Sequence, residues 1–137
     1  MILYKQEDIA ERVRAITGGV GARVVFDGVG KATWEASLKS AARRGLIISY
    51  GNASGPVEGV AMATLNTHGS LFTTRPTLFD YYRTPEERTA GIARLFEMLR
   101  EGAIRPEIGQ TFALEDAAEA HRRIGAGETE GSTLLLP

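Results

Sequence analysis

The sequence predicts an α/β protein whose strands lie parallel in one sheet and whose helices flank that sheet. Strand-like and helix-like segments alternate over residues 1–50, which is the pattern expected of a parallel sheet. The runs at 24–26 and 46–48 are apolar without polar alternation, as expected of strands covered on both faces. Glycines at 18–19 and at 45 stand where a helix would have to end before the next strand.

The first half of the chain is expected to run strand, helix, strand, helix, strand. Residues 1–4 form the first strand, and Asp8 caps a helix with apolar residues at 9, 13 and 16. Residues 23–26 form the second strand, and residues 32–44 form a helix that Gly45 closes. Residues 46–50 are the third strand.

The second half is expected to be less regular. Residues 60–65 form a short helix, and residues 71–76 form a strand that ends at a proline. Thr84-Pro85-Glu86-Glu87 combines an N-cap, a first-position proline and a capping-box glutamate. The helix that follows is predicted to bury Ile92, Leu95, Phe96 and Leu99. Residues 104–112 are extended, 115–124 form a short helix and 133–136 a terminal strand.

Composition excludes several classes of function. The chain has 137 residues and a net charge of −1, so it could not neutralise many phosphates of a nucleic acid. It holds no cysteine, which excludes disulfides and thiolate metal sites. No apolar run approaches the ~20 residues of a membrane span, and no signal peptide precedes the first segment. We therefore expect a cytoplasmic protein without nucleic-acid or membrane partners.

Polar turns follow three of the expected strands, at the edge where open α/β sheets bind ligands. The segment 27–30 either lines a cofactor or makes a simple tight turn, because the third glycine of a dinucleotide fingerprint is missing. The segment 51–55 presents free amide and hydroxyl groups to a ligand or is an ordinary polar loop. Arg75 pairs with a phosphate or carboxylate, or else forms a surface ion pair.

Other polar residues give weaker signals. Gly18-Gly19-Val20-Gly21 follows a helix and precedes a strand, which is the wrong order for a phosphate loop. His68 and His121 have no metal-ligand spacing, and His121 is expected to be half-buried. We identify no nucleophile, no acid–base pair and no metal site.

Five segments together carry a resemblance to a known family: "ILYKQEDIAERVRAITGG", "VVFDGVGKATWEASL", "GLIISYGNASGP", "GSLFTTRPTLFDY" and "GSTLLLP". With these motifs in this order, the chain resembles the C-terminal portion of NADPH-dependent quinone oxidoreductases. These are zinc-free members of the medium-chain dehydrogenase/reductase superfamily. The resemblance runs from end to end of the chain and implies a partial Rossmann-type parallel sheet with flanking helices.

The resemblance implies NADPH as the cofactor and assigns its contacts. The tyrosine matching Tyr4 lies near the adenosine phosphate in that family. The positions on the nicotinamide side are Gly28, Val29, Gly30, Tyr50, Gly51, Asn52, Thr74 and Arg75. No catalytic residue is carried over to this sequence.

The resemblance also implies that parts of the family's chain are missing. These are the catalytic domain that forms the quinone pocket and the first two strands with their pyrophosphate turn. What remains divides into a partial cofactor-binding domain at 1–102 and a segment at 103–137 that packs on the catalytic domain in the intact family. We expect a fragment of an NADPH:quinone oxidoreductase that is inactive alone and binds NADPH weakly or not at all.

The missing strands would leave residues 23–26 as an exposed sheet edge, which invites pairing with another strand. We expect either that residues 1–4 pair beside it or that two chains form a homodimer through their sheet edges. The family also pairs subunits through the strand matching 71–74. Two alternative functions stay open: a non-enzymatic module that associates through this edge, and a zinc-free alkenal reductase of the same superfamily.

Overall fold

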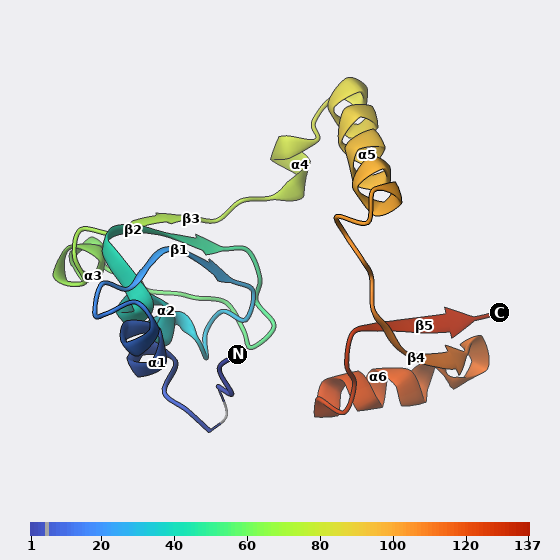
Figure 1. Cartoon of the computed structure of the whole chain (residues 1–137), viewed down its shortest axis with the longest axis horizontal. Helices are drawn as coiled ribbons and strands as arrows, with labels where there is room; N and C mark the ends of the chain where they lie inside the picture. The colour runs from blue at the N-terminus through green and yellow to red at the C-terminus, as the bar shows by residue number, and fades with distance from the viewer. Residues whose placement is uncertain (5) are drawn as a thin grey trace. The chain divides into compact units, whose positions relative to one another are not determined.

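A computed structural model describes residues 1–4 and 6–137, and a parallel three-stranded sheet is its main feature (Figure 1). The strand order is β1-β2-β3, and both pairings are parallel, so the predicted α/β class is confirmed. The elements of this part are α1 (Ile9–Ile16), β1 (Ala22–Asp27), α2 (Trp34–Ser40), β2 (Ala41–Ser49), α3 (Met62–Thr67), β3 (Phe72–Thr74) and α4 (Leu78–Tyr81).

The chain divides into two units, Met1–Tyr81 and Tyr82–Pro137. The second unit holds α5 (Pro85–Arg100), β4 (Ile108–Ala113), the 3-10 turn η1 (Leu114–Asp116), α6 (Ala117–Ala126) and β5 (Ser132–Leu136). Its strands β4 and β5 pair in parallel, and α6 packs against β4. The predicted boundary at residue 102 concerns packing on a catalytic domain of the family and stays a prediction.

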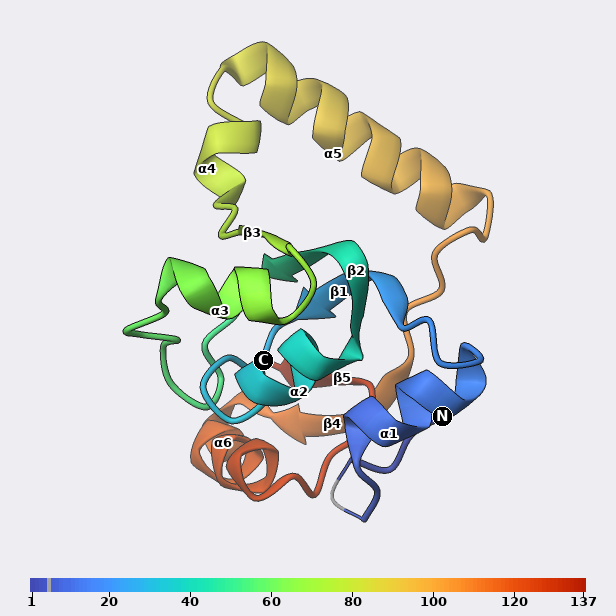
Figure 2. The same ribbon diagram turned by 90° about the vertical axis from the view of Figure 1, so that its left-hand side faces the viewer.

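The core of the first unit lies on one face of its sheet. Helix α2 packs against β1 and β2, and α1 packs against α2 (Figure 1 and Figure 2). The buried cluster consists of Leu38, Ala41, Ile47, Leu65 and Leu71.

Within the described residues of the first unit, apolar side chains on the other face of the sheet are exposed, which corrects the expectation of strands buried on both faces. Val24, Phe26 and Phe72 point away from the core and are 41%, 69% and 58% exposed. Side chains alternate across a strand, so these three lie opposite in direction to Val25 and Ile47. Apolar strands without alternation therefore do not show by themselves that both faces are covered.

The predicted strand at residues 1–4 is wrong. The carbonyl of Leu3 accepts hydrogen bonds from the backbone N–H groups of Gln6 and Glu7, at 2.7 and 2.9 Å, so the chain turns there. Within the described residues β1 has β2 as its neighbour on one side and no strand on the other, so its outer edge is free. Because residues 1–4 form no strand, the prediction that they pair beside residues 23–26 is also wrong.

The predicted helix over 32–44 is too long. It ends at Ser40, and Ala41 is already extended, with φ −67° and ψ 142°. Ala41 pairs with Ala22 of β1, so residues 41–45 belong to a nine-residue strand. The gain from pairing with β1 outweighs the helix propensity of the alanines and arginines in this segment. Gly45 lies inside β2 and does not close a helix.

Helix α5 begins as predicted, but its apolar side chains are not buried. Thr84 and Glu87 form the reciprocal capping box, and Pro85 occupies the first turn. However, Ile92 is 56%, Leu95 47% and Phe96 59% exposed, and α5 holds no buried residue. His121 on α6 is likewise exposed rather than half-buried.

Candidate functional site

The carboxyl ends of the three parallel strands lie at one edge of the sheet. The register pairs Phe26 with Ile48 and Ile48 with Thr74, so the turns that follow these strands are neighbours in space. Such an edge is where open α/β sheets bind ligands.

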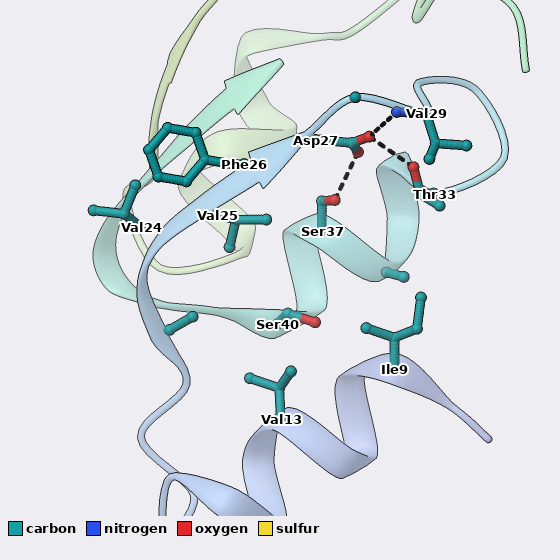
Figure 3. A pocket seen from close by; sticks show the side chains of 13 residues that line it. Ile9, Val13, Val24, Val25, Phe26, Asp27, Val29, Thr33, Ser37 and Ser40 are labelled. Carbon is teal, nitrogen blue, oxygen red and sulfur yellow. Dashed lines mark hydrogen bonds between the residues drawn. The ribbon is translucent and has the colours of Figure 1, made fainter. Parts of the chain in front are cut away.

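Asp27, the last residue of β1, organises the first of these turns (Figure 3). Its side chain is 4% exposed. One carboxylate oxygen accepts from the N–H groups of Val29 and Gly30 at 3.0 and 2.9 Å, and from the Thr33 hydroxyl at 2.8 Å. The other accepts from the Ser37 hydroxyl at 2.7 Å. Asp27 therefore ties the turn to the first part of α2.

The environment of Asp27 keeps it ionised. Burial acts to raise the pKa of its carboxyl, because a charge loses its hydration there. The four hydrogen bonds stabilise the carboxylate and outweigh burial, so the pKa lies below its ordinary value. All four donors come from within ten residues of Asp27, so this carboxylate stabilises the conformation of its own turn and the start of α2.

The loop after β2 is fastened to the same turn. The carbonyl of Asp27 accepts from the N–H of Tyr50 at 2.9 Å. Ser54 donates its hydroxyl to the Val29 carbonyl at 2.7 Å and accepts from the N–H of Ala32 at 2.9 Å. The expectation of free hydroxyl groups in this loop is thus wrong for Ser54, which bridges the two turns.

The glycines of the two turns allow this close packing. A Cβ on Gly51 would lie 2.0 Å from the Gly28 carbonyl oxygen, and one on Gly28 would lie 2.8 Å from the Tyr50 ring. Gly30 has φ +90°, and a Cβ there would lie 2.5 Å from the Gly55 carbonyl oxygen. Turn packing therefore already requires glycine at these positions. A cofactor contact at any of them stays a prediction.

Three residues implied as cofactor contacts line one open pocket of about 300 Å³ at this edge. They are Asn52, Thr74 and Arg75. The other residues around it are Trp34, Ser49, Pro56, Val57, Val60 and Thr73. The pocket thus combines apolar walls with amide, hydroxyl and guanidinium groups, as small-molecule sites do.

Arg75 is held at the rim of this pocket by the backbone of the neighbouring strand. Its guanidinium donates to the Ser49 carbonyl at 2.7 Å. When the Asn52 amide is oriented so that both its ends have partners, its NH₂ group donates to the Gly51 carbonyl. Its oxygen then accepts from Arg75 at 3.3 Å. Among the residues that the structure describes, Arg75 forms no ion pair, so the surface-pair interpretation is not supported.

The remaining residues implied by the resemblance lie outside this pocket. Tyr4 is 62% exposed in the N-terminal turn. Tyr50 is 57% exposed above Gly28, and Val29 is 38% exposed. Of the implied residues, only Asn52, Thr74 and Arg75 line this pocket. Gly30 and Gly51 lie beside Asn52 in the packed turns without lining it.

A second cavity, of about 260 Å³, lies between β1, α1 and α2 (Figure 3). Ile9 and Val13 of α1 form one wall, and Val25 and Asp27 of β1 form another. Ser40 also lines it, and the hydroxyl of Ser40 is buried without a hydrogen bond to any described residue. This cavity opens beside the free edge of β1.

Two important residues were not identified from the sequence. The signal for Asp27 was an acidic residue directly before a glycine turn, with hydroxyl side chains six and ten positions later. Trp34 could not be assigned to the pocket from the sequence, because a helical tryptophan is usually a core residue.

The described part of the chain offers no metal site: no group of three or more histidine, cysteine, aspartate or glutamate side chains could hold an ion there. His68 bonds instead to the Thr64 carbonyl, at 2.8 Å. Within residues 1–4 and 6–137, none of the helices has the length and apolar character needed to cross a membrane.

The family model described as "Zinc-binding dehydrogenase" matches residues 1–135. The chain belongs to this family. Because the residues present do not fit a zinc site, we assign no role to zinc in this chain.

Characterised relatives and solved structures agree with this assignment. The chain is 52% identical over 134 residues to a quinone oxidoreductase of Pseudomonas aeruginosa and 50% identical over 139 residues to one of Salmonella typhimurium. These matches cover 98% and 100% of this chain but 41% and 42% of the relatives. The Escherichia coli quinone oxidoreductase complexed with NADPH superposes with a TM-score of 0.92 at 46% identity, over 99% of this chain and 42% of that one.

These findings confirm the resemblance to quinone oxidoreductases and the Rossmann-like fold. The chain spans about two-fifths of the length of the relatives it matches (42% for the Salmonella protein).

Proposed function

We propose that the pocket lined by Asn52, Thr74 and Arg75 binds part of an NADPH molecule. We further propose that this chain corresponds to the nucleotide-binding part of an enzyme that reduces a quinone. The observation that carries the proposal is the convergence of these three side chains at the carboxyl edge of a parallel sheet. The NADPH bound to the Escherichia coli relative supports it.

The donor set of the pocket fits a nucleotide. Arg75 offers a fixed positive charge to a phosphate, and its bond to the Ser49 carbonyl orients it before any ligand arrives. The Asn52 amide and the Thr73 and Thr74 hydroxyls suit a carboxamide or ribose. NADPH, when bound, would supply the hydride, and the residues of this chain would hold and orient it.

Trp34 gives a direct assay, because it is the one tryptophan of the chain and lines the pocket. We expect NADPH to bind weakly and to change the fluorescence of Trp34. Arg75→Gln should weaken binding about tenfold, as expected for a lost charge-assisted contact. Arg83→Gln is the matched control. Equal binding by both variants would refute the assigned pocket, and steady NADPH oxidation with a quinone would refute the expected inactivity of the chain alone.

A second function is favoured by the free edge of β1, which leaves a row of backbone groups available to another strand. We propose that the chain associates through this edge, most simply as a homodimer. Phe26 on that strand is 69% exposed. Light scattering should report a dimer with or without nucleotide, and Phe26→Lys should shift it to monomer. Phe79→Lys, at an exposed residue of α4, is the control. A wild-type monomer would refute association.

We also propose a cytoplasmic location, which the cysteine-free sequence supports. Fractionation of cells that express the protein would test it.

A further inference from the structure

Three arginines gather at the end of the sheet opposite to the proposed nucleotide pocket. Arg23, Arg43, Arg44 and Phe72 line an open cavity of about 320 Å³. Arg23 stands near the start of β1, and Phe72 is the first residue of β3. Arg44 and Ser49 are five residues apart along β2, which places the two ends about 16 Å from each other.

An irregularity in the sheet creates this cluster. Ala22 pairs with Ala41, but Val24 pairs with Leu46, so Arg23 alone stands opposite the four residues 42–45. Such a bulge re-aims side chains at the rim of a sheet. Arg44 has φ +60°, a left-handed conformation that is unfavourable for a residue with a side chain. Its N–H donates to the Gly69 carbonyl at 2.7 Å, which holds the bulge in place.

Within the described part of the chain, the three guanidinium groups lack partners that would offset their charge. Among the residues that the structure describes, none of them makes a side-chain hydrogen bond or an ion pair. Other arginines of the chain do: Arg12 pairs with Glu7 at 2.7 Å, and Arg122 with Glu119 at 2.7 Å. Three like charges placed together repel one another, and a bound anion would relieve that repulsion.

We propose that this cavity, the arginine pocket, binds a small phosphorylated molecule. Guanidinium groups match phosphate oxygens with paired N–H donors, which favours a phosphate over a simple halide. Phe72, 58% exposed beside the arginines, offers an apolar surface for a planar group such as a nucleobase. The ligand class is therefore a nucleoside monophosphate or a similar phosphate ester. The site is separate from the proposed nucleotide pocket.

The test is a titration of the whole chain with three probes at physiological ionic strength: adenosine monophosphate, inorganic phosphate and adenosine. Calorimetry gives the affinity, and amide NMR shifts at residues 43, 44 and 69 locate the site. We expect adenosine monophosphate to bind more tightly than phosphate, and adenosine not to bind. Arg43→Gln with Arg44→Gln should weaken adenosine monophosphate binding at least about tenfold.

The control removes the same charge elsewhere. Arg83→Gln with Arg100→Gln changes two arginines that also lack side-chain partners in the described structure, and it should alter the affinity less than twofold. An equal loss in both double variants would show attraction to net charge only, and would overturn the proposal. So would shifts that avoid residues 43, 44 and 69, or the absence of phosphate-ester binding at millimolar concentration.

The test of the arginine pocket can be separated from the test of the NADPH proposal. The double variant at 43 and 44 should leave NADPH-induced changes in Trp34 fluorescence unaltered, because Trp34 lies at the other pocket. Conversely, Arg75→Gln should leave the binding of adenosine monophosphate unchanged. Either proposal can therefore fail without the other.

Discussion

Removing the carboxylate of Asp27 should unfold the first unit more readily than any other single polar substitution in its turns. Asp27→Ala deletes the acceptor of four donors, two from the backbone and two from hydroxyls. A hydrogen bond to a charged group contributes about 1.5–3 kcal/mol, and water entering the emptied site would compensate part of the sum. We therefore expect the free energy of unfolding to fall by about 3–5 kcal/mol.

Asp27→Asn should be milder, because one amide oxygen can still accept from Val29, Gly30 and Thr33. Its NH₂ group would face Ser37, whose hydroxyl can turn to become the acceptor. The loss of charge should cost about 1–2 kcal/mol. Asp80→Asn makes the same chemical change at an exposed residue and is the control.

The assay is urea unfolding followed by Trp34 fluorescence, because Trp34 packs against the core cluster of the first unit. The pKa of Asp27 is lowered in the folded state, so its ionisation stabilises the fold above the unfolded-state pKa. That contribution disappears as the pH falls through the folded-state pKa. The difference between wild type and Asp27→Asn should thus be largest near neutral pH and vanish in acid. An Asp27→Ala variant within about 0.5 kcal/mol of wild type would refute the reasoning.

Two further changes test local features. Gly30→Ala should cost about 2–4 kcal/mol, because φ is +90° and the added Cβ would lie 2.5 Å from the Gly55 carbonyl oxygen. Gly59→Ala, with φ +66° and nothing within 4 Å, should cost only about 1 kcal/mol in the same urea assay. Thr84→Ala removes the acceptor for the Glu87 N–H and should weaken the first turn of α5 by about 1 kcal/mol. Amide exchange should accelerate in that turn alone, and uniform acceleration along α5 would contradict a capping role.

Local signals in the sequence were sufficient to predict where helices α1 and α5 begin. Asp8 accepts from the Glu11 N–H at 2.9 Å, and Thr84 forms the capping box, both as predicted. These contacts join residues three positions apart, so the pattern that predicts them is complete within a short window. Strand β1 and the second half of β2 were predicted for a related reason, since each contains a short apolar run bounded by turn residues.

Features that depend on distant partners were not predictable in this way. The helix over 32–44 ends early because Ala41 pairs with Ala22, and nothing within 32–44 indicates that pairing. The bulge that gathers Arg43 and Arg44 follows from the same register. In the candidate site, the segment that holds Asn52 and the residue Arg75 were indicated by their places after two strands, and the resemblance then named them as cofactor contacts. Ser54 was misinterpreted because its partners lie in another turn.

The hydrogen bonds that Asp27 accepts restrict the chemistry available at the edge of the sheet where the strands end. Its carboxylate accepts from four donors and its pKa is lowered, so it is unsuited to take up a proton near neutral pH. The polar side chains that line the proposed nucleotide pocket are serine, threonine, asparagine and arginine, which serve as hydrogen-bond donors and acceptors. Such a pocket suits the binding and orienting of a molecule. In the proposed function, NADPH would supply the hydride and these residues would hold it, which is the division of labour expected of a nucleotide-dependent reductase.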